Sequence, residues 1–139
     1  NYVKQAEDPF VVYKEFMDLI SQDDVIIVGQ NLLGYDIYIL GVIARKLGLD
    51  INYSFVNRIF DTKAIATALA KGNKTPDKDD FIAWQIKWLH YRERGLKTNQ
   101  KRLLEYYDIK FDEKKLHDAL YDIEKNFEIF IKQLWELDI

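Results

Sequence analysis

Apolar residues recur at helical spacing in several stretches of the chain, separated by short polar breaks. The first stretch follows Asp8-Pro9, an N-cap residue with proline at the first helical position, and predicts a helix over residues 9–20. Further helices are predicted over residues 36–47, 63–70, 80–89, 99–107 and 118–137. The last of these carries an apolar stripe that we expect to face the core, at Leu120, Ile123, Phe127, Ile131 and Leu134.

Two short segments have the pattern of buried strands. Residues 25–28 form a continuous β-branched run, which suits a strand covered on both faces, and residues 57–60 precede Asp61-Thr62. The alternation of helix and strand predicts an α/β fold in which the two strands are adjacent and parallel, with the final helix packed on their sheet. Since two strands do not make a stable sheet between helices, more strands are expected upstream of residue 1.

Composition narrows the class of protein. The chain has 139 residues, 48% of them apolar, which is enough for one folded domain over residues 1–139. It contains no cysteine, so disulfides, Cys-ligated zinc and thiol catalysis are excluded. No apolar run is long enough for a membrane span and no secretory signal is visible, so we expect a cytoplasmic protein without a membrane partner.

Charge is unevenly distributed along the sequence, although the net charge is only −3. Residues 87–102 carry six basic side chains opposed by Glu93 alone, whereas acids outnumber bases from residue 103 onward. A site that holds cations and contacts phosphate would need both signs close together.

Two segments carry candidate chemistry. Asp36 follows a predicted strand and loop, and a carboxylate there would point into the crevice in which α/β proteins bind ligands. His117 and Asp122 lie five residues apart at the start of the last helix, where a carboxylate beside a histidine is a plausible hydrolytic pair. The alternative is structural: Asp36 caps a helix, and Asp122 favours the positive end of another. Asp61 is interpreted as a helix cap.

Three motifs in order resemble those of the DEDD superfamily of 3′–5′ exonucleases, and in particular its histidine-containing branch, which includes the proofreading epsilon subunit of bacterial replicases. Asn31 with Tyr35-Asp36 resembles the second motif of the family, and Phe60-Asp61-Thr62 resembles the strand-to-helix step that follows. His117-Asp118-Ala119-Leu120-Tyr121-Asp122 matches the third motif, in which histidine, any residue, alanine, two of any residue and aspartate follow one another.

The resemblance implies a ribonuclease H-like three-layer fold, here a helix-rich fragment lacking the N-terminal strands. The first family motif, Asp-any-Glu on an opening strand, is absent before Phe10, and Gln30 stands where many members of this branch carry histidine. Two of the four metal-binding carboxylates would therefore be missing from this chain.

The resemblance also implies the chemistry. Two Mg²⁺ or Mn²⁺ ions would bind the scissile phosphate, with Asp36 and Asp122 as ligands and His117 as the base that deprotonates water. The substrate would be single-stranded or 3′-terminal DNA or RNA, cleaved to 5′-mononucleotides, and a polymerase remains open as a partner. Contacts with the terminal nucleotide and with phosphates are expected from Asn31, Tyr35, Lys97, Lys101 and Arg102.

Several alternatives stay open. The three basic residues would otherwise form a solvated helix face, and Trp84 and Trp88 would either stack bases or lie in the core. A catalytically inactive exonuclease-like module for nucleic-acid binding or interaction would explain the missing first motif. An unrelated helical scaffold would leave the position of Asp36 and the third-motif match as coincidences.

Overall fold

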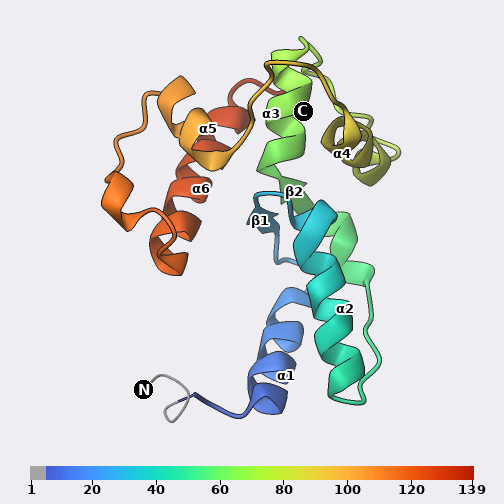
Figure 1. Ribbon diagram of the computed structural model, residues 1–139. Coiled ribbons are helices and arrows are strands. Elements are labelled where there is room, and N and C mark those ends of the chain that lie inside the picture. Colours follow the sequence, from blue (N-terminus) through green and yellow to red (C-terminus); the bar gives the residue numbers. More distant parts are fainter. Residues whose placement is uncertain (1–5) are drawn as a thin grey trace.

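The computed structural model of the protein describes residues 6–139 and is a helix-rich α/β structure (Figure 1). Its strands are β1 (Ile27–Gly29) and β2 (Ile59–Asp61). Its α-helices are α1 (Pro9–Ile20), α2 (Ile37–Lys46), α3 (Thr62–Ala70), α4 (Phe81–His90), α5 (Gln100–Tyr106) and α6 (Ala119–Leu134). Short helical turns complete it at η2 (Leu32–Asp36), η3 (Ser54–Arg58) and η4 (Glu113–Lys115).

The two strands pair in parallel, as predicted, with Val28 opposite Phe60. Each begins two residues later than its sequence pattern indicates. The reason lies with Arg58, which ends η3 and whose guanidinium donates to the carbonyls of Ile20 and Val25, at 2.7 and 2.9 Å. These contacts hold the segments before the strands in turns, so the ladder starts only at Ile27 and Ile59.

Helices cover both faces of this small sheet. On one face, Ile59 packs in a cluster with Ile20 from α1 and Leu33 from η2. On the other, the ring of Phe60 meets Phe130 of α6 edge to face, with centroids 5.3 Å apart. The predicted packing of the last helix on the sheet is therefore confirmed.

The contact between α6 and the start of α3 is polar and buried. The Thr62 hydroxyl donates to the Asn126 side-chain carbonyl at 2.7 Å, and the Gln133 amide donates to the Thr62 carbonyl at 2.8 Å. All three side chains are buried, so these bonds position α6 more specifically than apolar packing alone would.

The outer edge of β2 is closed by one side chain. Gln85 of α4 accepts a hydrogen bond from the Asp61 N–H at 2.7 Å and donates one to the Ile59 carbonyl at 2.8 Å. Its amide thus takes the place of a neighbouring strand. Gln85 is fully buried, and an unpaired strand edge in that position would be costly.

The outer edge of β1 is open. Backbone groups alternate in direction along a parallel ladder, so Val28, opposite Phe60, turns its N–H and carbonyl away from β2. Within residues 6–139 the sheet has two strands, and β1 has β2 as its single neighbour.

The apolar stripe predicted to bury α6 lies largely on its outer side, and that prediction was wrong. Leu120, Ile123 and Phe127 have exposed fractions of 67%, 66% and 54%. The helix instead buries a neighbouring side, at Asn126, Ile129, Phe130 and Gln133. Apolar residues occur on two sides of this helix, and α3 with the sheet covers only one of them. No helix among the described residues is both long and apolar enough to cross a membrane.

Candidate functional site

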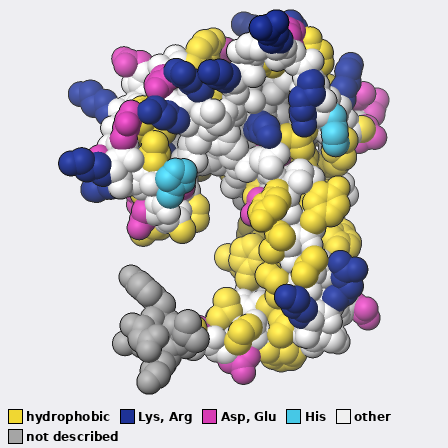
Figure 2. Space-filling model, in the orientation of Figure 1, with side chains coloured by type: hydrophobic (Ala, Val, Ile, Leu, Met, Phe, Trp, Pro, Cys, Tyr) yellow, Lys and Arg dark blue, Asp and Glu magenta, His cyan; other side chains and the backbone are white. Residues whose placement is uncertain are grey.

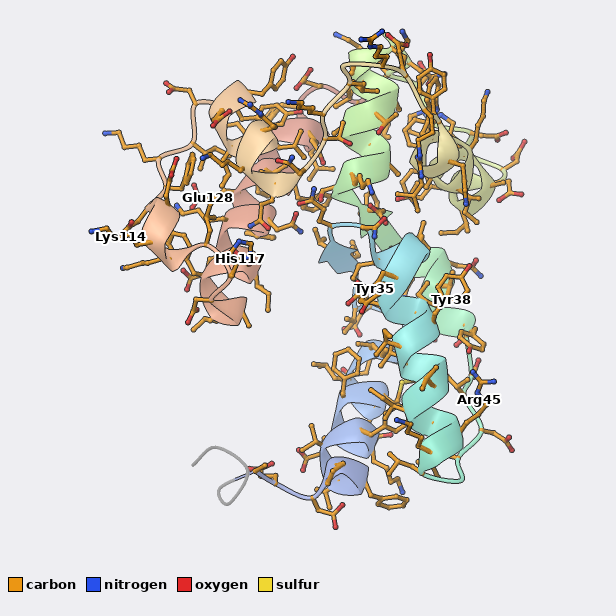
Figure 3. All side chains as sticks on the ribbon, in the orientation of Figure 1. Tyr35, Tyr38, Arg45, Lys114, His117 and Glu128 are labelled. Atoms are coloured by element: carbon orange, nitrogen blue, oxygen red, sulfur yellow. The ribbon has the colours of Figure 1, made fainter. Side chains whose placement is uncertain are left out.

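The molecule is hollowed between two arms, with the sheet at the closed end (Figures 1 and 2). One arm consists of α5, η4 and α6, and the other of α1 and α2. His117 and Tyr35 lie on opposite sides of this hollow (Figure 3). Residues of the second and third candidate motifs therefore border the same open space, each on its own arm.

His117 and Asp122 are in contact, as their spacing suggested. The His117 backbone N–H donates to both Asp122 carboxylate oxygens, at 3.3 and 3.2 Å. His117 has a φ of 80°, in the left-handed region, and Asp118 caps α6 through the Tyr121 N–H. The His117 side chain is exposed, so its imidazole is accessible from the hollow.

Asp122 is also tied to α5. The Gln100 side-chain amide donates to the Asp122 carbonyl at 2.8 Å. The N-terminus of α5, capped by the Asn99 side chain, is thereby fixed against the start of α6. The Asp122 carboxylate thus accepts from the backbone just before α6, while its carbonyl holds α5.

Asp36 ends η2 and directly precedes α2. Asp36 does not act as an N-cap through its side chain, because that side chain makes no capping hydrogen bond. Partial burial beside an apolar cavity lined by Phe16 and Ile27 raises the pKa of the Asp36 carboxyl above its ordinary value. Its neighbour Tyr35 is exposed.

Asn31 lies in the left-handed region, with φ 66°, directly after the turn that leaves β1. Its backbone N–H donates to Asp61 at 2.9 Å, and its side-chain carbonyl accepts from the Lys63 ammonium at 3.2 Å. The side chain is therefore fixed rather than free, and it joins the loop after β1 to the start of α3.

The Asp61 carboxylate holds the loop after β1 through hydrogen bonds to its backbone. As predicted, it caps α3, accepting from the N–H groups of Lys63 and Ala64. The sequence did not reveal that it also accepts from the N–H groups of Asn31 and Leu33, which lie 30 and 28 residues away. The carboxyl is fully buried, and burial raises its pKa above the ordinary value although four backbone N–H groups act in the opposite direction. Its place at the end of a buried strand was the available signal.

The predicted phosphate contacts divide into two kinds. Lys101 pairs with Glu113 and Arg102 with Glu105, both at 2.7 Å on the surface, so the structural alternative describes them well. Lys97 instead lines a cavity with Asn31. The two tryptophans lie in the core, with Trp84 and Trp88 only 7% and 8% exposed, and base stacking is not available to them.

The described residues contain no group of three or more histidine or acidic side chains that could hold a metal ion. Mg²⁺ requires about six oxygen ligands in near-octahedral geometry. Asp36 and Asp122 come from different arms and would supply only part of such a set. No family model matches the sequence, and neither a curated protein nor a solved structure is significantly similar to it.

Proposed function

We propose that this chain forms most of a metal-dependent 3′–5′ exonuclease with a ribonuclease H-like fold, whose site is completed by a further strand at the open edge of β1. The observation that carries the proposal is the position of the paired His117 and Asp122. They lie across the same hollow from Tyr35, which directly precedes Asp36, and the motif resemblance requires residues of both motifs to face a shared space.

The open edge of β1 is an argument for a further strand in the sheet. Among residues 6–139 the outer edge of β1 at Val28 has no neighbouring strand, and the side chains of Leu120, Ile123 and Phe127 of α6 are exposed. Monomeric proteins rarely leave open both a strand edge and a neighbouring apolar face. A strand bearing two carboxylates next to β1 would cover part of this surface and bring four carboxylates to one site.

The residues present have suitable roles for phosphodiester hydrolysis. His117, with an accessible imidazole, would take a proton from the attacking water. Asp122 already accepts from the His117 backbone but retains lone pairs for a cation, since an ionised carboxylate has about four acceptor positions. Asp36 would approach from the α2 arm. Mg²⁺ or Mn²⁺, when bound, would neutralise charge on the phosphate and activate water.

The test compares the chain alone with a longer polypeptide that carries an Asp-any-Glu strand ahead of α1. With a 5′-labelled oligonucleotide and Mg²⁺ or Mn²⁺, the longer protein should release mononucleotides from the 3′ end, and EDTA should stop it. The chain alone should be inactive. In the longer protein, Asp122→Ala should abolish turnover, and His117→Ala should slow it roughly 10²–10⁴-fold. Full activity of the Asp122→Ala variant would refute the proposed mechanism.

A second candidate is an exonuclease-like module that binds nucleic acid or another protein without cleaving. The absence of a three-ligand group among the described residues favours it. It predicts that the longer polypeptide binds DNA or RNA 3′ ends with both ions present yet never releases mononucleotides.

A further inference from the structure

A cavity of about 440 Å³ opens where both strands end. Gln30 and Asn31 follow β1, Lys63 follows β2, and all three line the cavity together with residues of the segment between α4 and α5. Parallel α/β sheets bind ligands outside the carboxyl ends of their strands, and ligand pockets commonly measure about 300–1,000 Å³.

The cavity wall is basic. It contains the cationic side chains of Lys63, Arg92 and Lys97 and the single carboxylate of Glu93. That carboxylate is already engaged, because it accepts from the Lys71 ammonium at 2.7 Å and from the Tyr91 hydroxyl at 2.6 Å. The hydrogen bond from Lys71 lowers the pKa of Glu93, so it stays charged within that pair and leaves the other cations uncompensated.

Two of the three cations that line the cavity are held by neutral partners. The Lys63 ammonium contacts the Asn31 side-chain carbonyl, and the Arg92 guanidinium donates to the carbonyls of Leu89 and Tyr91. Asp61 lies close by, but it is fully buried and its oxygens accept four backbone N–H groups. None of the three cations that line the cavity has a carboxylate partner among the described residues.

The cavity is also connected to the α6 site. Thr98 and Asn99 line it, Thr98 accepts from the Gln30 amide at 2.7 Å, and the next residue, Gln100, donates to the Asp122 carbonyl. Three consecutive residues, 98–100, therefore connect the cavity to the backbone carbonyl of Asp122, the residue whose carboxylate is proposed to act in hydrolysis. Figure 2 shows Lys and Arg side chains gathered over the end of the molecule that contains α3, α4 and α5.

We infer that this cavity binds a backbone phosphate of a single-stranded nucleic acid, with Lys63 and Lys97 as its principal contacts. The identity of the ligand as nucleic acid rests on the proposed function. The site is distinct from the predicted contacts at Lys101 and Arg102, which are ion-paired. It would hold a phosphate of the strand away from the terminal residue while His117 and Asp122 act at the end.

The experiment measures binding of a 5′-fluorescein-labelled oligothymidylate to the present chain by anisotropy, in EDTA to prevent cleavage and over a range of NaCl concentrations. Lys63→Gln and Lys97→Gln are compared with Lys46→Gln, which removes an exposed charge at the end of α2. Circular dichroism checks that each variant is folded.

Each cavity variant should weaken binding roughly 5- to 10-fold at 0.05 M salt and reduce the slope of log K against log salt by about 0.7, the value for one lost phosphate contact on a single strand. The Lys46→Gln variant should match the unmodified chain. Equal affinity and slope in all four proteins would overturn the inference.

Failure of this inference is distinguishable from failure of the proposed function. If the longer polypeptide never hydrolyses nucleic acid but binding still depends on Lys63 and Lys97, the exonuclease proposal fails and the phosphate site stands. If hydrolysis occurs but binding is insensitive to both lysines, the phosphate site is wrong and the exonuclease proposal stands.

Discussion

His117 presents its backbone N–H, not its imidazole, to the carboxylate of Asp122, with nitrogen–oxygen distances of 3.3 and 3.2 Å. The left-handed backbone of His117 makes this possible, since it turns the N–H back over the first turn of α6. Asp122 therefore stabilises the start of the helix in addition to any role in hydrolysis, and the two contributions can be measured separately.

Replacement of Asp122 by alanine should lower the free energy of unfolding of the present chain by about 0.5–1 kcal/mol, because the first turn loses both an acceptor and a favourable charge. Urea denaturation followed by circular dichroism measures the change. Glu124→Ala, an exposed position in the same helix, is the control and should alter stability by only a few tenths of a kcal/mol. Equal losses in the two variants would show that the contact is not stabilising.

Replacement of Gln85 by leucine should be much more damaging. The change leaves the Asp61 N–H and the Ile59 carbonyl buried without partners, at a cost of roughly 2–4 kcal/mol. Gln22→Leu, at an exposed position after α1, should stay within about 0.5 kcal/mol of the unmodified chain. If urea midpoints show similar stabilities for both variants, the amide does not close the sheet edge as described.

Local sequence patterns were sufficient for the six α-helices among residues 6–139, although both strands begin two residues later than predicted. The caps at Asp8 and Asp61 were predicted and are present, since each depends on a contact within three residues. The buried side of α6 could not be predicted, because periodicity identifies an apolar side without showing what covers it. The role of Gln85 was equally hidden, as it depends on a strand 24 residues earlier in the chain.

In the candidate site, too, contacts between residues close in sequence were predictable and contacts between distant segments were not. The sequence spacing predicted that His117 and Asp122 lie together. It could not indicate that the backbone N–H of His117 makes the contact, because a positive φ at histidine has no sequence signal. Spacing also missed the link from Asp61 to Asn31, which joins the ends of two strands. Contacts across the sheet depend on packing, and packing is decided by the whole chain.

The Asp61 carboxyl provides a test in pH. Its pKa is raised by burial, so the folded state binds the proton more tightly than the unfolded state. Its contribution to stability is therefore fully present below the unfolded pKa, about 3.9, and is lost as pH rises through the raised folded value. Asp61→Asn removes this titration and should destabilise by about 1–3 kcal/mol, because one oxygen acceptor becomes a donor facing the Leu33 N–H.

The measurement is the stability difference between the unmodified chain and Asp61→Asn at several pH values from about 4 upward. The deficit of the variant should shrink as pH rises, since only the unmodified chain pays for ionising a buried carboxyl. A deficit that grows with pH would show that the four backbone N–H groups outweigh burial, and that the folded pKa is depressed.

The outward side of α6 predicts self-association. Ile123 and Phe127 are exposed on α6, a helix that contacts β1, and an exposed apolar surface tends to pair with other chains. Ile123→Lys should lower the average mass measured by sedimentation at high protein concentration. Ile139→Lys, similarly exposed but near the C-terminal end of the chain, should leave it unchanged. If both variants associate like the unmodified chain, the α6 face is not the contact.

The amide of Gln85 determines at which edge the sheet can be extended. Within residues 6–139 the outer edge of β2 is closed by a side chain and that of β1 is open, so a further strand would join next to Val28 and not next to β2. The 134 described residues therefore leave one position for a further strand, and a strand that adds to this sheet would have β1 as its neighbour.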